Sequence, residues 1–365
     1  MKKKILVIIL AALFLISCNK QGQEYSGLNE FEVLDVDVEG LSEKDAMDKA
    51  FAIVDERYPV TSIDFKEEDR IVDQVDLSKA GIKLLADFRA TDDNIIVLDQ
   101  EDNNIKVFDW EGKLLKSVGK LGSGEMEFKI PTAFFFDQAN KLYYILDNGN
   151  RRIVVIDEDL NFVKNIEVKT FKDKRNGDIF NSIVIYKDKI YLAESYGSEK
   201  TMAIISLDMD GNEKLYDQKF GGILKVVDDK LYAIEQIRGF KFGKKVDTEL
   251  GSHEYQIWPS CADAMYLVEE DKMKKLYDLP NLASFTDMLK IGDSYYLPSG
   301  SFGILHEFKV VNKEMKYQKS LTHQLLDNLK DHVDSTRRFK MQEMDGNILL
   351  MDAMADKIYI IDLSD

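Results

Sequence analysis

Arginines and aromatic residues in predicted loops are the side chains of this chain with the best chemistry for holding a ligand. Arginine offers forked donors that fit carboxylate or phosphate groups, and a flat ring offers a surface for a sugar or a peptide side chain. The candidates of these two kinds are Arg151, Arg238, Arg337, Tyr196, Trp258 and Phe302. Each also has a structural alternative, such as a tie between blades for Arg151 and an anchor for its own loop for Trp258.

The sequence carries no pattern typical of a catalytic or metal-binding set. Its four histidines, at positions 253, 306, 323 and 332, lack the i, i+2 or i, i+4 spacing of a ligand pair. The acidic segment Asp208–Asn212 lacks the distal glutamate of an EF-hand loop and is typical of a hairpin turn. Cys261 has no matched histidine or other base. The sequence therefore predicts no catalytic residue, no metal site and no cofactor.

The charge balance argues against nucleic acid as a partner. The chain has 49 Lys and Arg against 66 Asp and Glu, a formal net charge of −17. A body of this charge repels a polyanion. Hydrophobic residues make up 45% of the chain, which is ample for a large packed core.

A repeated unit of four short predicted strands must position these side chains. Its clearest copy runs from Gly119 to Val168. Asp99 and Asp147 are 48 residues apart, and Asp157 and Asp208 are 51 residues apart. Repetition at a fixed period of this kind predicts a β-propeller, in which strands a to d of each blade form an antiparallel sheet.

We predict an all-β fold, a six-bladed β-propeller over residues 66–365, with seven blades as the alternative count. The fourth blade is interrupted by an insertion at about residues 236–262, and the sixth ends one strand short at Asp365. A strand at residues 70–77 lies before the first blade and has no partner there. We expect it to complete the sixth blade, because this pairing removes the open edges of a linear array.

The N-terminal segment resembles the signal of bacterial lipoproteins. Three lysines precede an uncharged apolar run at residues 5–16, which is too short to span a bilayer. Leu15-Ile16-Ser17-Cys18 then resembles the lipobox, in which the cysteine is acylated and becomes the first residue. The resemblance implies a lipoprotein signal peptide at residues 1–17 and lipid attachment at Cys18. The protein would then be held at a membrane by this lipid.

Between this segment and the propeller we expect a tether and lead-in at residues 18–41 and one amphipathic helix at residues 42–58. Ser42 is a suitable N-cap, with Asp45 three residues further on. The apolar face of the helix is formed by Met47, Ala50, Phe51, Val54 and Tyr58. The helix either packs on the propeller or binds a partner.

The repeat unit also resembles a known family. Residues that match the NHL repeat are Gly119, Gly122, Gly124, Phe128, Pro131, Asp137, Leu142, Tyr143, Asp147 and Asn150–Ile153. The whole body is similar to the six-bladed, NHL-type propeller lipoproteins common in Bacteroidetes-like bacteria. This resemblance implies a lipid-anchored protein of the bacterial cell envelope, either periplasmic or surface-exposed. Some NHL-type propellers are zinc lyases with inward-facing histidines.

The predicted loop lengths favour a binding function. The a–b and c–d turns on one face are short, whereas every long segment falls on the opposite face, where function is usually found. We therefore expect a membrane-anchored, extracytoplasmic module that binds an envelope protein, peptide or glycan through this loop-rich face. The alternatives are a structural role and a channel-centred enzyme of lyase or lactonase type, possibly metal-dependent. The nearest channel carboxylates for an enzyme are Asp87, Asp137, Asp178 and Asp287.

Overall fold

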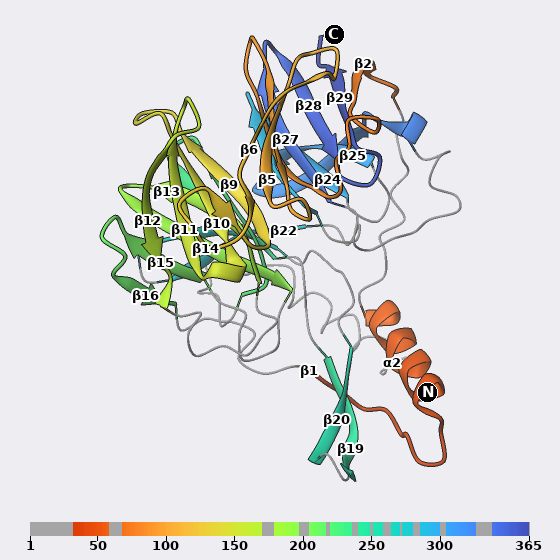
Figure 1. Cartoon of the computed structure of the whole chain (residues 1–365). Coiled ribbons are helices and arrows are strands. Elements are labelled where there is room, and N and C mark those ends of the chain that lie inside the picture. Colours follow the sequence, from red (N-terminus) through yellow and green to blue (C-terminus); the bar gives the residue numbers. More distant parts are fainter. Residues whose placement is uncertain are drawn as a thin grey trace.

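The computed structural model describes residues 32–57, 68–169, 179–196, 204–216, 220–235, 240–248, 251–257, 264–270, 272–279, 285–299, 304–325 and 338–364. Over these residues the chain forms six four-stranded antiparallel sheets (Figure 1). The first strands of blades one to four contact one another in order, and blades four and five share an apolar cluster. The first strand of blade six contacts those of blades five and one, so the sheets close into a ring. The protein is an all-β, six-bladed propeller with a single helix in this part of the chain, as the sequence predicted.

The strand bounds follow the predicted blades. Blade one has β3 (Leu85–Ala90), β4 (Ile95–Asp99), β5 (Asn104–Phe108) and β6 (Leu114–Val118), and blade two has β9 (Pro131–Asp137), β10 (Leu142–Asp147), β11 (Arg152–Asp157) and β12 (Phe162–Glu167). Blade three has β13 (Ile179–Tyr186), β14 (Lys189–Tyr196), β15 (Ile204–Asp208) and β16 (Glu213–Leu215), and blade four has β17 (Gly222–Val227), β18 (Lys230–Glu235), β21 (Ala264–Val268) and β22 (Met273–Asp278). Blade five has β23 (Leu289–Ile291), β24 (Ser294–Ser299), β25 (Ile304–Val311) and β26 (Glu314–Ser320), and blade six has β27 (Phe339–Met344), β28 (Asn347–Asp352) and β29 (Lys357–Asp362). Short elements in the connections are β7 (Lys120–Leu121), β8 (Glu127–Phe128), η1 (Asn148–Asn150) and η3 (His323–Leu325).

The fourth strand of blade six comes from the other end of the chain. β2 (Ile71–Asp76) pairs antiparallel with β29, which gives the sheet order β2-β29-β28-β27. Val75 and Leu77 are buried against blade one, whereas Val72 on the same strand is 63% exposed. The strand that the sequence placed at residues 70–77 therefore completes the sheet of the C-terminal strands.

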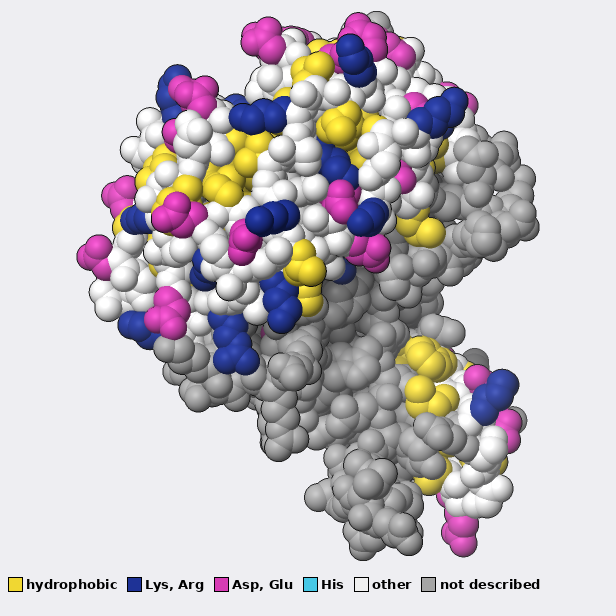
Figure 2. Space-filling model, in the orientation of Figure 1, with side chains coloured by type: hydrophobic (Ala, Val, Ile, Leu, Met, Phe, Trp, Pro, Cys, Tyr) yellow, Lys and Arg dark blue, Asp and Glu magenta, His cyan; other side chains and the backbone are white. Residues whose placement is uncertain are grey.

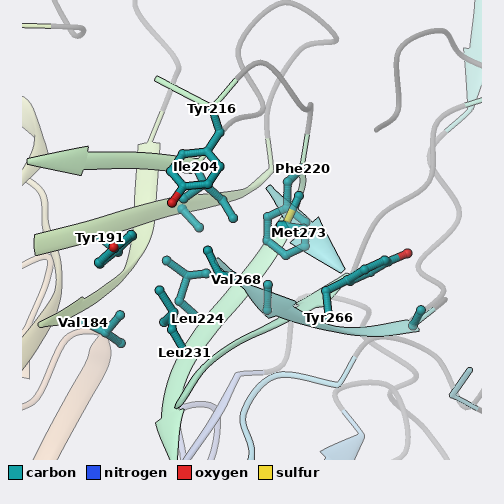
Figure 3. Close-up of a cluster of buried hydrophobic side chains, with 13 residues drawn as sticks. Val184, Tyr191, Ile204, Tyr216, Phe220, Leu224, Leu231, Tyr266, Val268 and Met273 are labelled. Carbon is teal, nitrogen blue, oxygen red and sulfur yellow. The ribbon is translucent and has the colours of Figure 1, made fainter. Parts of the chain in front are cut away.

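Apolar side chains fill the spaces between neighbouring sheets, which explains why the inner strands read as continuous apolar runs. On β10, Tyr143 and Ile145 pack toward blade one, whereas Tyr144 and Leu146 pack toward blade three. Figure 3 shows the equivalent layer between blades three and four, where strands of both sheets contribute side chains. Both faces of an inner strand are thus buried, and the blades are held together by their cores.

A small accessory unit lies outside the ring. β19 (Phe240–Thr248) and β20 (Gly251–Ile257) form a hairpin within the insertion between β18 and β21, and β1 (Glu32–Leu34) pairs in parallel with β19. The three strands and α2 (Glu43–Arg57) project together from one end of the propeller (Figure 1). The lead-in thus contains a strand, and the insertion contains a hairpin where the sequence suggested only a long loop.

The helix of this unit is capped and packed locally. The Ser42 hydroxyl accepts the Asp45 backbone N–H at 3.2 Å and donates to the Asp45 carboxylate at 2.6 Å. Ala46, Ala50 and Val54 are buried in a separate apolar cluster with β1 and the residues that follow it, and α2 contacts β20. The helix therefore belongs with the accessory unit. None of the helices that the structure describes is long and apolar enough to cross a membrane.

Candidate functional site

The first strands of the blades surround a cavity of about 270 Å³ on the propeller axis. All six blades line it, through residues 87–89, 133–136, 182–184, 223–226, 287 and 340–342. These strands have one edge without a neighbouring strand, so their backbone groups at that edge need other partners. Polar side chains of the cavity supply some of these partners.

Asp87 ties blade one to blade two. One carboxylate oxygen accepts the Phe134 backbone N–H of the next blade at 3.1 Å, and the other accepts the N–H of Phe88 at 2.9 Å. The side chain is only 8% exposed, and this burial raises the pKa of the Asp87 carboxyl, although the charge of Lys340 opposes the shift. The carboxyl group thus has a structural task that occupies both oxygens.

Asp287 repeats this arrangement between blades five and six. Its oxygens accept the backbone N–H groups of Met288 at 2.9 Å and Met341 at 2.6 Å. One of them also pairs with the Lys225 ammonium of blade four at 2.7 Å. In blade three the Ser182 hydroxyl accepts the backbone N–H of Leu224, on the first strand of blade four, at 2.9 Å. Alternate blades therefore use a short polar side chain to satisfy the free edge of their neighbour.

The other two carboxylates considered for a channel enzyme do not join this pair. Asp137 accepts the backbone N–H groups of Ala139 at 3.0 Å and Asn140 at 3.3 Å, so it stabilises the a–b turn of blade two. Asp178 lies outside the described residues. Among the described residues, no group of three or more His, Cys, Asp and Glu side chains could hold a metal ion.

Cationic residues complete the cavity wall, and two of the three have partners. The Arg89 guanidinium lies 3.7 Å from the centre of the Phe136 ring and donates to the Tyr143 hydroxyl at 3.0 Å. Lys225 is paired with Asp287. The Lys340 ammonium makes no hydrogen bond or ion pair with any residue that the structure describes. These cations were not predicted from the sequence, where only histidines and carboxylates on the first strands were considered as channel residues.

Two adjacent arginines on the loop-rich face, Arg151 and Arg152, have different environments in the structure. Arg152 pairs with the fully buried Asp147 at 2.9 Å and donates to the backbone oxygens of Gly124 and Glu127 at 2.7 Å. It therefore holds the connection between blades one and two in place. Arg151 is exposed and adopts a left-handed backbone conformation, with φ of 58°, at the end of η1. Arg151 thus stays available as a ligand-binding candidate.

The other predicted binding residues lie partly or wholly outside the described part of the structure. Tyr196 is the last residue of β14, but its side chain is outside the described part of the structure. Four further candidates and the lipid-attachment residue also lie outside the described residues: Arg238, Trp258, Phe302, Arg337 and Cys18.

His306 lies in the core and not in a site. It stands on β25, the third strand of blade five, and its Nδ1 lies 2.9 Å from the Ser320 hydroxyl. The rings of Phe285, Phe308 and Tyr317 surround it at centroid distances of 5.9–6.3 Å. Burial lowers the pKa of His306 from 6.5 to about 3, so the ring is neutral at physiological pH.

On the propeller face seen in Figure 2, the charged side chains of the described residues are of mixed sign. Figure 2 shows acidic and basic side chains interspersed over the propeller face in view. Despite the net charge of −17, the described residues of this face form no continuous acidic or basic patch that would point to one class of charged partner.

Comparisons with known proteins support the fold. Residues 79–234 match the family model DUF5128, described as a 6-bladed beta-propeller. No protein with a curated description matches the chain. A structural genomics protein of unknown function from Bacteroides thetaiotaomicron superimposes with a TM-score of 0.51 at 12% identity, over 81% of this chain and 73% of the other. A catalytically inactive virginiamycin B lyase from Staphylococcus aureus with quinupristin gives 0.50 at 12% identity, over 80% and 99%. At such identities the likeness shows the fold alone.

Proposed function

We propose that this protein is a binding module of the bacterial cell envelope, held at a membrane by lipid on Cys18. Its loop-rich face would recognise an envelope protein, a peptide or a glycan. The proposal extends the lipobox resemblance and the NHL-like repeat to a function. No property of the distant solved relatives enters it.

One observation carries this proposal: the accessory unit is built on a connection of the loop-rich face. The a–b and c–d connections of the described blades are short, from two residues at 228–229 to five at 109–113. The b–c and d–a connections on the opposite face include 168–178, 236–263 and 321–338. A rigid ring that carries additional structure on one face is typical of a scaffold for recognition.

The cavity favours binding over catalysis. Asp87 and Asp287 are the channel carboxylates that the structure describes, and backbone N–H groups occupy the oxygens of both. A general acid or base must instead offer its oxygen to the proton that it transfers. The enzyme hypothesis is therefore weakened at two of the four carboxylates considered for it.

Deletion of the insertion tests the proposed face. In the lipidated protein, residues 239–258 would be replaced by a short Gly-Ser turn, and photo-crosslinked envelope partners would be compared with those of the wild type. We expect loss of the crosslinked species. The matched control exchanges the a–b turn at Lys187 and Asp188 for Asn-Gly on the opposite face and should retain them. Equal crosslinking by all three proteins would refute the use of this face.

Two further measurements separate anchoring and catalysis from recognition. Radiolabelled palmitate should enter the wild-type protein in its bacterial host and should not enter the Cys18→Ala variant. Metal analysis of the purified mature protein should find no stoichiometric zinc or calcium. A full equivalent of either metal would contradict the proposal of a binding module without a metal cofactor.

A further inference from the structure

We propose that the axial cavity binds a small monocarboxylate with an apolar body, and that the Lys340 ammonium is the partner of its carboxylate. This second site lies on the propeller axis, apart from the loop-rich face, and does not rest on the function proposed above.

The cavity wall contains more cationic than anionic side chains, and one of the cations has no close ion-pair partner among the described residues. Lys225 and Asp287 form an ion pair at 2.7 Å, and Arg89 stacks on an aromatic ring and donates to a tyrosine hydroxyl. Asp87 accepts two backbone N–H groups. Lys340 makes no hydrogen bond or ion pair with a described residue; its charge acts on Asp87 only from a distance, and it is partly buried in the cavity wall. A partly desolvated ammonium without a hydrogen-bonded counter-ion favours an anionic ligand.

A single negative charge fits this site better than two. Asp87 and Asp287 stand in the same wall as Lys340, so a dianion such as phosphate would meet two acidic groups for one free cation. The raised pKa of Asp87 reduces this repulsion for a monoanion, because its neutral form becomes more accessible. A carboxylate also matches the ammonium as an acceptor of charge-assisted hydrogen bonds.

The rest of the lining favours an apolar body on the ligand. Most of the other residues that line the cavity are apolar, among them Phe88, the run Phe134–Phe136 and Met341, and several of their side chains also pack in the cores between blades. Ligand pockets are typically of this kind, mainly apolar with a few polar groups that fix orientation. The volume of about 270 Å³ lies just below the usual range of such pockets and suits a small molecule with on the order of ten non-hydrogen atoms.

Calorimetric titration with phenylacetate tests the site, with 3-phenylpropionate and hexanoate as further probes and phenylacetamide as the uncharged isostere. We expect saturable binding of at least one carboxylate by the wild type. Phenylacetamide should bind at least ~10-fold more weakly than phenylacetate, since it lacks the charge that Lys340 would pair. Absence of saturable binding for all three carboxylates, or equal affinity for acid and amide, overturns the proposal.

Variants of Lys340 locate the anion. Lys340→Met keeps the length of the side chain and removes its charge, so we expect carboxylate affinity to fall ~10-fold or more. Lys340→Arg keeps the charge and should retain measurable affinity. Lys187→Met, on an exposed turn outside the cavity, is the matched control and should bind as the wild type does. Unchanged carboxylate affinity in Lys340→Met overturns the assignment, and if that variant does not fold, the acid and amide pair on the wild type still decides.

Discussion

Stability should decrease below pH 6.5 because His306 is buried in its neutral form. The folded state holds the pKa of this ring at about 3, against 6.5 for an unperturbed histidine, and desolvation is the cause. Between pH 6.5 and pH 3, the unfolded chain therefore binds a proton at this histidine that the folded chain does not bind. The stabilising contribution is fully present above pH 6.5 and is lost as the pH falls toward 3. By proton linkage, the free energy of unfolding falls by about 1.4 kcal/mol for each pH unit below 6.5, which gives about 2 kcal/mol between pH 7 and pH 5.

Urea unfolding of the wild type and of His306→Phe at a series of pH values measures this contribution. Phenylalanine keeps a ring among Phe285, Phe308 and Tyr317 but cannot be protonated. Carboxylates titrate in both proteins, so the difference between the two free energies of unfolding isolates the histidine. We expect that difference to change by about 2 kcal/mol from pH 7 to pH 5.

A control variant keeps His306 and replaces the other three histidines, at positions 253, 323 and 332, by glutamine. It should follow the pH dependence of the wild type. A constant difference between the wild type and His306→Phe across pH 7 to pH 5 would refute the reasoning. In that case His306 would have an ordinary pKa in the folded state, and the packing around it would have to admit solvent.

Three further predictions concern the scaffold and are all measured as the free energy of unfolding in urea. Arg152→Ala should cost about 3–5 kcal/mol because it leaves a fully buried carboxylate unpaired, whereas the neighbouring Arg151→Ala should change stability by less than about 0.5 kcal/mol; equal effects would contradict the assigned roles. Gly119→Ala should cost more than about 1 kcal/mol, since φ is 97° and the new Cβ would lie 2.5 Å from a buried aromatic ring; a neutral result would show that this turn can relax. Val75→Asp should cost more than about 3 kcal/mol, and Val72→Asp on the exposed side of the same strand should be near neutral; tolerance of both would argue against the packing of β2 on the ring.

The repeating scaffold was accessible from the sequence because its pattern is set by local chemistry. Asp99 and Asp147 recur 48 residues apart since both end a second strand, are fully buried and accept backbone N–H groups from the start of their own blade. The short turns follow the same rule, because two to five polar residues are enough to reverse an antiparallel pair. Features that recur in every blade can thus be read without knowledge of the tertiary contacts.

The accessory unit could not be read in this way. The pairing of β1 with β19 joins residues 32–34 to residues 240–242. No repeat or hydrophobic period in the sequence indicates a contact between segments so far apart along the chain. A three-residue strand is also too short for an alternating pattern to be recognised. Its formation depends on the neighbours that the fold supplies.

Side-chain roles on the axis and on the loop-rich face were equally hard to assign from the sequence. Arg151 and Arg152 are identical in type, and only the register of β11 decides that the second one reaches Asp147. In the sequence, Lys340 cannot be distinguished from any other lysine on a strand. Its place in the axial cavity depends on the assembly of all six blades. Sequence patterns state which residues are present, whereas the absence of a partner for a charge is a property of the assembled ring.

The pairing of β2 with β29 also has a consequence for the order in which the chain folds. Five blades consist of segments that follow one another along the chain, so each can form through contacts of short range. The sixth requires residues 71–76 to meet residues 357–362, and that loop closure spans nearly the whole domain. Ring closure is therefore expected to be the late, slow step of folding, during which the edges of blades one and six stay open to pairing with other chains.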